Sequence, residues 1–227
     1  MKTILSEIIT RIRRAALTAN RDPHTVRLVA VSKTKPIEMI REAVEAGVDI
    51  IGENYIQEAR DKYNALGALS VSWHFIGHLQ TNKAKYAVRM FDLIHTVDSV
   101  HLAVELDKQA AKIGKIQDIL IQVNIAEEQS KSGVSCAAVQ PLIESIAPLS
   151  HLRIRGLMTM PPFFDAPEKA RPYFKALRLL RKDLNELKIQ NVILKELSMG
   201  MTGDFEAAIA EGATLVRIGT ALFGRRD

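Results

Sequence analysis

Short apolar runs rich in β-branched residues alternate with helix-like stretches along the whole chain. Helical periodicity is clearest at 37–46, 55–66, 100–113 and 167–187. Strict alternation of this kind indicates parallel strands joined by right-handed crossovers, and eight such units are the count of a closed (β/α)8 barrel, or TIM barrel. The strand-like runs lie at 28–33, 49–54, 72–77, 93–98, 118–125, 152–160, 192–199 and 215–219.

An open, doubly wound sheet is the alternative α/β architecture. It often carries a Gly-rich dinucleotide fingerprint after its first strand, and no G-x-G-x-x-G follows residue 33. No Pro/Gly/Ser-rich linker or charge block divides the chain, so residues 1–227 are predicted to form a single domain. Before the first strand, apolar residues from Ile4 to Ile12 recur at helical spacing and predict an extra N-terminal helix.

Charge and cysteine content limit the classes of function. The net charge is +5, but acidic and basic residues are interleaved, and the longest basic clusters are only residues 11–14 and 225–226. This pattern is typical of solvated helix faces and argues against a nucleic-acid-binding surface. The single Cys136 excludes an internal disulfide framework and fits a reducing compartment. Without a signal peptide or an apolar stretch that could span a bilayer, a cytoplasmic protein with no membrane partner is expected.

Lys33 stands at the outgoing end of the first strand-like run, directly before a helix that starts after Pro36. A lysine there directs its amine into the mouth of the barrel, although most lysines at strand ends are simply solvated. If the extended conformation persists, Lys35 faces the same side. Repulsion between the two ammonium groups would lower one pKa and make that lysine a nucleophile near neutral pH.

The last two strand ends carry small and hydroxyl residues next to helix starts. Ser198 to Asp204 lead into one helix-like segment, and Gly219 with Thr220 follow the final strand. Backbone N–H groups and hydroxyls in such loops suit a phosphate dianion, and barrels commonly bind phosphate after strands seven and eight, although the same residues also cap helices. Arg217 lies in an otherwise apolar strand, so its guanidinium requires either an acidic partner or a ligand.

An amine on the first strand, a phosphate site after the last two and an arginine between them suggest pyridoxal 5′-phosphate (PLP) bound as a Schiff base. Sugar phosphates handled by Schiff-base aldolases are the competing ligand class, but those enzymes usually place the lysine later in the chain. The four histidines at 74, 78, 95 and 101 are not spaced as a metal site, so no metal is predicted.

Several long motifs in the right order resemble the YggS/PROSC family of pyridoxal phosphate homeostasis proteins, which share the barrel of the alanine racemase N-terminal domain. The resemblance runs from the first strand to Gly224. Its motifs are AVSKTKP at 30–36, GENYIQE at 52–58, WHFIGHLQTNK at 73–83, GLMTM at 156–160, LSMGMT at 197–202 and RIGT at 217–220. Thr202 stands where that family more often has serine.

The resemblance implies roles for residues at the strand ends. Lys33 would form the Schiff base, Arg217 would face the pyridine nitrogen and Asn54 would lie beside the ring. Ser198, Gly219 and Thr220 would hold the phosphate. The predicted cofactor-binding set is Lys33, Asn54, Met158, Ser198, Met199, Arg217, Gly219 and Thr220, with no catalytic residue beyond the covalent lysine.

Three functions fit these residues. The first is a carrier that stores, buffers or delivers PLP, with PLP-dependent apo-enzymes as possible partners, because a cation opposite the ring nitrogen weakens the ring as an electron sink. The second is an amino-acid racemase with His78 or a lysine as its base. The chain ends at Asp227 without the second domain that supplies the racemase tyrosine, so the carrier and a monomer are expected. The third is a regulatory protein, supported only by the basic charge. Lys131 is expected in a loop over the barrel mouth.

Overall fold

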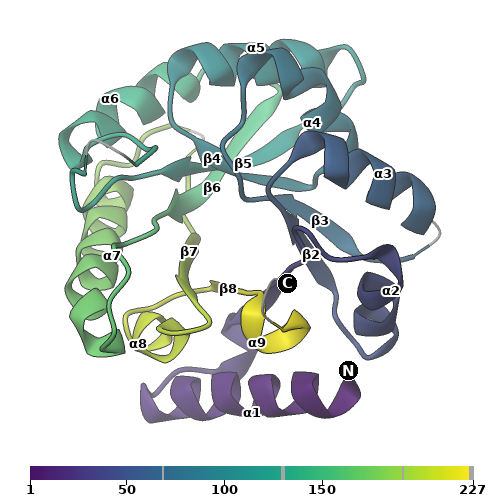
Figure 1. The fold of residues 1–227 in the computed structure, drawn as a ribbon. Coiled ribbons are helices and arrows are strands. Elements are labelled where there is room, and N and C mark those ends of the chain that lie inside the picture. The colour runs from purple at the N-terminus through teal and green to yellow at the C-terminus, as the bar shows by residue number, and fades with distance from the viewer. Residues whose placement is uncertain (68, 129–130, 191, 225–227) are drawn as a thin grey trace.

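The computed structural model describes residues 1–67, 69–128, 131–190 and 192–224. Its parallel strands form one closed barrel in the order β1 to β8, with β8 paired to β1, which confirms the predicted TIM barrel (Figure 1). Arg225 and Arg226, one of the two basic clusters noted above, lie outside the described residues. The strands are β1 (Arg27–Val31), β2 (Ile50–Glu53), β3 (Ser72–Phe75), β4 (Leu93–Val97), β5 (Gln117–Gln122), β6 (Leu152–Met158), β7 (Glu196–Met201) and β8 (Leu215–Ile218).

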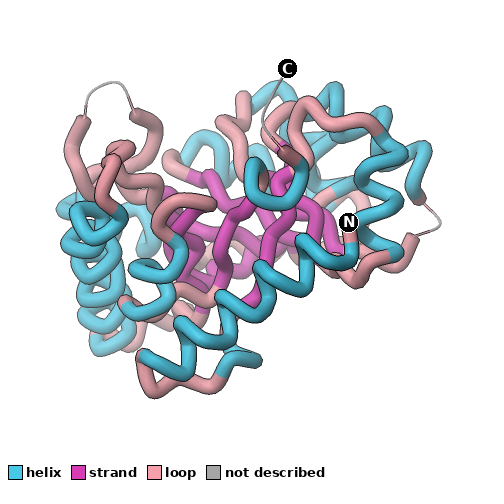
Figure 2. Tube along the Cα trace, turned by 60° about the horizontal axis from the view of Figure 1, so that its bottom comes forward, coloured by secondary structure: helices cyan, strands magenta, loops and turns pink. Residues whose placement is uncertain are grey.

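Helices surround the barrel, and α1 crosses outside it against α8 and α9 (Figure 2). This helix buries Leu5, Ile8, Ile12 and Ala16 on one face, as its periodicity predicts, which confirms the extra N-terminal helix. No helix in the described part of the chain is both long and apolar enough for a bilayer span. The α-helices are α1 (Lys2–Thr18), α2 (Ile37–Glu45), α3 (Ile56–Leu66), α4 (Ala84–Met90), α5 (Val100–Ala111), α6 (Cys136–Ile146), α7 (Arg171–Glu186), α8 (Phe205–Ala210) and α9 (Thr220–Phe223).

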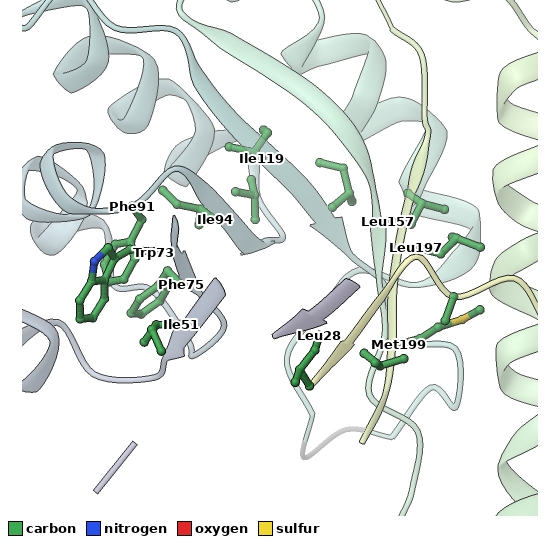
Figure 3. Close-up of a cluster of buried hydrophobic side chains, with 14 of the residues drawn as sticks. Leu28, Ile51, Trp73, Phe75, Phe91, Ile94, Ile119, Leu157, Leu197 and Met199 are labelled. Carbon is green, nitrogen blue, oxygen red and sulfur yellow. The ribbon is translucent and has the colours of Figure 1, made fainter. Parts of the chain in front are cut away.

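Strand residues alternate between two apolar layers, one inside the barrel and one beneath the helices. The inner layer includes Val29, Leu120 and Met158. The outer layer contains Trp73 and Phe75, whose side chains lie among those drawn in Figure 3. Because residues that face inward recur at every second position, each strand end presents its side chains alternately to the barrel mouth and to the outer core.

All eight strands differ from the sequence-based bounds at one end or both, and the differences in β1 and β7 bear on the site. β1 ends at Val31, so Lys33 lies in the following turn and not in the strand. β7 begins at Glu196 instead of residue 192. The segment before it is held by Asn185, whose side chain bonds the backbone N–H and C=O of Leu194 at 3.0 Å each, and this replaces ladder pairing there.

Candidate functional site

A cavity of about 310 Å³ opens at the carboxyl ends of β1, β2, β6, β7 and β8. Residues far apart in the sequence meet there, because parallel strands of a barrel all end at the same face. The cavity contains a lysine amine, a guanidinium and two loops with glycines. Six of the eight residues predicted to bind cofactor line it: Lys33, Asn54, Met158, Arg217, Gly219 and Thr220.

Lys33 enters the cavity from a tight turn. The Ser32 N–H still bonds Gly52 of β2 at 3.0 Å, and the Lys35 N–H closes the turn on the Ser32 carbonyl at 3.1 Å. Thr34 has a φ of 63°, which lies in the left-handed region. The extended conformation therefore does not persist beyond Lys33. The expectation that an extended backbone would turn Lys33 and Lys35 to the same side is wrong, and of these two lysines it is Lys33 that lines the cavity.

Arg217 projects inward from β8 and is almost fully buried. Its Nη1 donates to Ser198 Oγ at 2.6 Å, and its Nη2 donates to the Thr159 carbonyl at 2.9 Å. Burial lowers the pKa of Arg217 to about 10, while the charge of Asp204 opposes that shift. The group therefore remains cationic at neutral pH and is fixed in orientation by two hydrogen bonds.

A chain of hydrogen bonds continues from Arg217 across the barrel interior. Ser198 Oγ lies 2.9 Å from His95 Nδ1, and His95 Nε2 lies 3.0 Å from His74 Nδ1. Arg217 can only donate to Ser198. When the Ser198 hydroxyl in turn donates to His95, each imidazole carries its proton on Nε2. Burial lowers the pKa of both histidines, that of His74 to about 3, so both are neutral.

Two of the eight predicted cofactor-binding residues are not in the cavity lining. Ser198 lies beneath Arg217 with its hydroxyl committed to Arg217 and His95, and Thr202 lines the cavity instead. The Met199 side chain faces the other way, into the outer core beside Leu197 (Figure 3). Strand alternation is the reason, because Ser198 points into the barrel and its neighbour must point outward.

The loops after β7 and β8 form one end of the cavity. Gly200, near the end of β7, has a φ of +90°, and an added Cβ there would lie 2.5 Å from the Ala208 Cβ, so the strand end and its contact with α8 both require glycine. Gly203 has open space on its Cα side, and Gly219 precedes the uncapped first turn of α9. Small residues therefore line this end of the cavity, together with Thr202 and Thr220.

Asn54 separates this cavity from a second one. Its Oδ1 atom is buried and has no hydrogen-bond partner among the described residues. The second cavity, of about 610 Å³, is lined by Asn54, Tyr55, His78 and Lys83 among others. His78, the base suggested for a racemase, thus lies across Asn54 from Lys33 and does not line the cavity that Lys33 enters.

Sequence reasoning missed the apolar rim of the cavity. Pro162, Phe163 and Phe164 follow β6 and line the mouth, with Phe163 85% exposed and Phe164 stacked on Tyr173 at 5.8 Å between ring centroids. The FF pair in a Pro-rich loop was the available signal. Within the described residues, no group of three or more His, Cys, Asp or Glu side chains is placed to hold a metal ion.

The family model described as "Alanine racemase, N-terminal domain" matches residues 5–227, so the barrel with a lysine at its mouth is one of this class. A pyridoxal phosphate homeostasis protein of Aquifex aeolicus is 47% identical over 222 residues, covering 98% of this chain and 96% of its own. The Escherichia coli K12 protein of the same name is 42% identical over 228 residues, covering 98% and 95%. This chain belongs to the pyridoxal phosphate homeostasis protein family.

A solved structure supports the same grouping. PipY of Synechococcus elongatus, described with PLP bound, is 38% identical and superposes with a TM-score of 0.83. The match covers 94% of this chain and 100% of that one. The resemblance to this family that the sequence motifs indicate is therefore confirmed.

Proposed function

We propose that this chain binds PLP covalently through Lys33 and acts in PLP homeostasis, by storing, buffering or delivering the cofactor without significant catalysis. The observation that carries the proposal is the meeting of Lys33, Arg217 and the Gly219–Thr220 turn in one cavity. Relatives at 42–47% identity are named for PLP homeostasis, and the related PipY structure is described with PLP bound.

The residues of the cavity fit the functional groups of PLP. The Lys33 amine suits the aldehyde, and the threonine hydroxyls and small-residue loops suit the phosphate. The orphaned Asn54 Oδ1 is an acceptor available to a polar substituent of the ring. The Arg217 guanidinium, which two hydrogen bonds hold in place, suits the pyridine nitrogen, because that nitrogen is an acceptor. PLP, when bound, supplies an electrophilic aldehyde and a conjugated ring.

The covalent step needs no other reactant. The neutral Lys33 amine forms a bond to the aldehyde carbon, the carbonyl oxygen leaves as water, and a carbon–nitrogen double bond remains, so that no oxidation or reduction occurs. The reaction is reversible by addition of water. A protein that holds its cofactor in this way can both capture and release it, as a carrier requires.

The position of Arg217 favours the carrier over an enzyme that relies on a protonated ring nitrogen. A cation held against the pyridine nitrogen disfavours protonation of that nitrogen and so restrains carbanion chemistry. The two hydrogen bonds to Ser198 and Thr159 keep the guanidinium in place. Transfer of PLP to apo-enzymes, a cytoplasmic location suggested by the single cysteine and a monomeric state are parts of the same proposal.

Borohydride reduction tests the covalent assignment. Purified protein incubated with PLP and reduced should gain one pyridoxyl phosphate group, which peptide mapping should place on Lys33. A Lys33→Ala variant should remain untagged, whereas Lys35→Ala, which changes the lysine two residues away, should be tagged as fully as the wild type. A tag on another lysine, or no tag on the wild type, would overturn the assignment.

Turnover distinguishes the carrier from the racemase. PLP-loaded protein incubated with a panel of L-amino acids should yield no D-isomer above a protein-free PLP control in chiral chromatography. Sustained formation of a D-amino acid would favour the racemase, with His78 as the first residue to replace.

Replacing Phe163 with serine should affect retention of PLP and leave stability almost unchanged. The exposed ring at the cavity mouth buries little area in the folded chain, so the free energy of unfolding should change by less than about 0.5 kcal/mol. Loss of an apolar cover should raise the rate of PLP release by roughly tenfold or less, since about 1 kcal/mol of contact is removed. Transfer of PLP to an excess of a competing aldehyde scavenger measures that rate, and equal release from both proteins would contradict the prediction.

A further inference from the structure

One ionic network holds the backbone on both sides of Lys33. The Lys62 ammonium donates to the Ser32 carbonyl at 2.6 Å, and the Thr34 N–H donates to Glu58 Oε1. The Ser32 hydroxyl donates to Glu53 Oε1 at 2.5 Å. The residues immediately before and after Lys33 are therefore both tied to charged side chains.

The three charged side chains are joined through a single atom. Lys62 Nζ lies 2.7 Å from Glu53 Oε1 and 2.6 Å from Glu58 Oε1. Glu53 is fully buried at the end of β2, Lys62 is almost fully buried on α3, and Glu58 is partly exposed one helical turn before Lys62. We call Glu53, Glu58 and Lys62 the Lys62 clamp.

Burying the charged side chains of the clamp costs free energy of desolvation, which their ion pairs and hydrogen bonds must offset. A buried ion pair is often no more stabilising than apolar residues of similar size, so stability alone is weak grounds for one. Beyond the clamp itself, its described side-chain hydrogen bonds connect it to Ser32 and Thr34. Thr34 adopts a left-handed φ of 63° without being glycine, a conformation that surrounding contacts must enforce.

We propose that the Lys62 clamp is a positioning device that fixes the turn around Lys33 and so sets how fast that amine captures an aldehyde. The inference rests on the proposed function, because it assigns Lys33 as the covalent residue. None of the three clamp residues lines the cavity, so they act through Ser32 and Thr34 and do not touch the ligand. Pre-organisation of this kind accelerates a reaction by holding the nucleophile in the attacking geometry.

Glu58→Ala tests the clamp, because Glu58 is its most exposed member and holds Thr34 directly. The rate of borohydride-trappable PLP capture at Lys33 should fall by roughly tenfold or more. Binding of pyridoxine 5′-phosphate, which has the same ring and phosphate but no aldehyde, should be unchanged. Glu58→Gln, which keeps an oxygen acceptor for Thr34, should restore much of the capture rate.

Asp61→Ala is the matched control, since Asp61 is an exposed acid on the same helix and lies outside the clamp. It should capture PLP at the wild-type rate, with all proteins assayed at a temperature where unfolding curves show them folded. If Glu58→Ala slows capture and weakens pyridoxine phosphate binding by the same factor, the damage is general and the inference is overturned. A wild-type capture rate in Glu58→Ala would overturn it as well. Absence of a Lys33 tag on the wild type would instead defeat the proposed function.

Discussion

Replacing Lys62 with methionine is expected to lower the free energy of unfolding by about 3–5 kcal/mol, the usual effect of removing one partner from a buried ion pair. Methionine has a similar length, so little cavity is created. The loss arises because Glu53 remains fully buried without its cation, and its Oε2 atom already has no partner among the described residues. Urea unfolding at neutral pH measures the change.

The pH dependence of that loss identifies its cause. Burial raises the pKa of Glu53, and Lys62 opposes the rise, so removing Lys62 raises this pKa further. When the pKa of a carboxyl group is higher in the folded than in the unfolded state, the folded protein gains stability as the pH falls. The deficit of Lys62→Met should therefore shrink between about pH 8 and pH 5, and adding Glu53→Gln should recover part of it at pH 8.

Lys182→Met provides the comparison for an exposed pair. Lys182 pairs with Glu186 at 3.7 Å on α7, where both side chains are well exposed, so its loss should cost less than about 1 kcal/mol. If Lys62→Met and Lys182→Met destabilise the protein equally, the buried network contributes nothing special to stability.

The barrel could be predicted from the sequence because alternation of period-2 and period-3.6 patterns is a local property. Polar residues at strand ends were likewise visible, and parallel strands bring such ends together without any knowledge of packing. Lys33 and Arg217 are far apart in the chain, yet Lys33 lies in the turn after β1, Arg217 lies near the carboxyl end of β8, and both line one cavity. The topology alone made that juxtaposition predictable.

Two features could not be predicted from the sequence: the side of the barrel wall to which each strand residue points, and the contacts between residues far apart in the chain. A one-residue difference in register decides whether Ser198 or Met199 points into the barrel, and the pattern LSMGM does not settle it. The left-handed Thr34 depends on contacts with Glu58, which lies 24 residues later. The bonds of His95 to His74 and Ser198 span 21 and 103 residues, so no local pattern indicates that these histidines belong to one interior chain.

The interior histidines lead to the second large prediction, a loss of stability in mild acid. The folded pKa of His74 is about 3, and that of a free imidazole is about 6.5. Between these two pKa values the unfolded state therefore binds a proton and the folded state does not. The contribution of His74 to stability is complete above about pH 6.5 and is lost as the pH falls. At about pH 5 the loss from His74 alone is about 2 kcal/mol, and His95, whose pKa burial also lowers, acts in the same direction.

His74→Asn isolates this contribution. An asparagine oxygen can accept the His95 Nε2 proton in place of His74 Nδ1, but it does not titrate. Burial raises the pKa of Glu53 and Asp204, which act in the opposite direction. The wild type and His74→Asn both retain these two groups, so their effect cancels in the comparison. Between about pH 7.5 and pH 5 the wild type should lose about 2 kcal/mol more than His74→Asn in urea unfolding. Parallel losses would mean that His74 takes up its proton as readily in the folded as in the unfolded state, and the neutral chain from Arg217 to His74 would then be wrong.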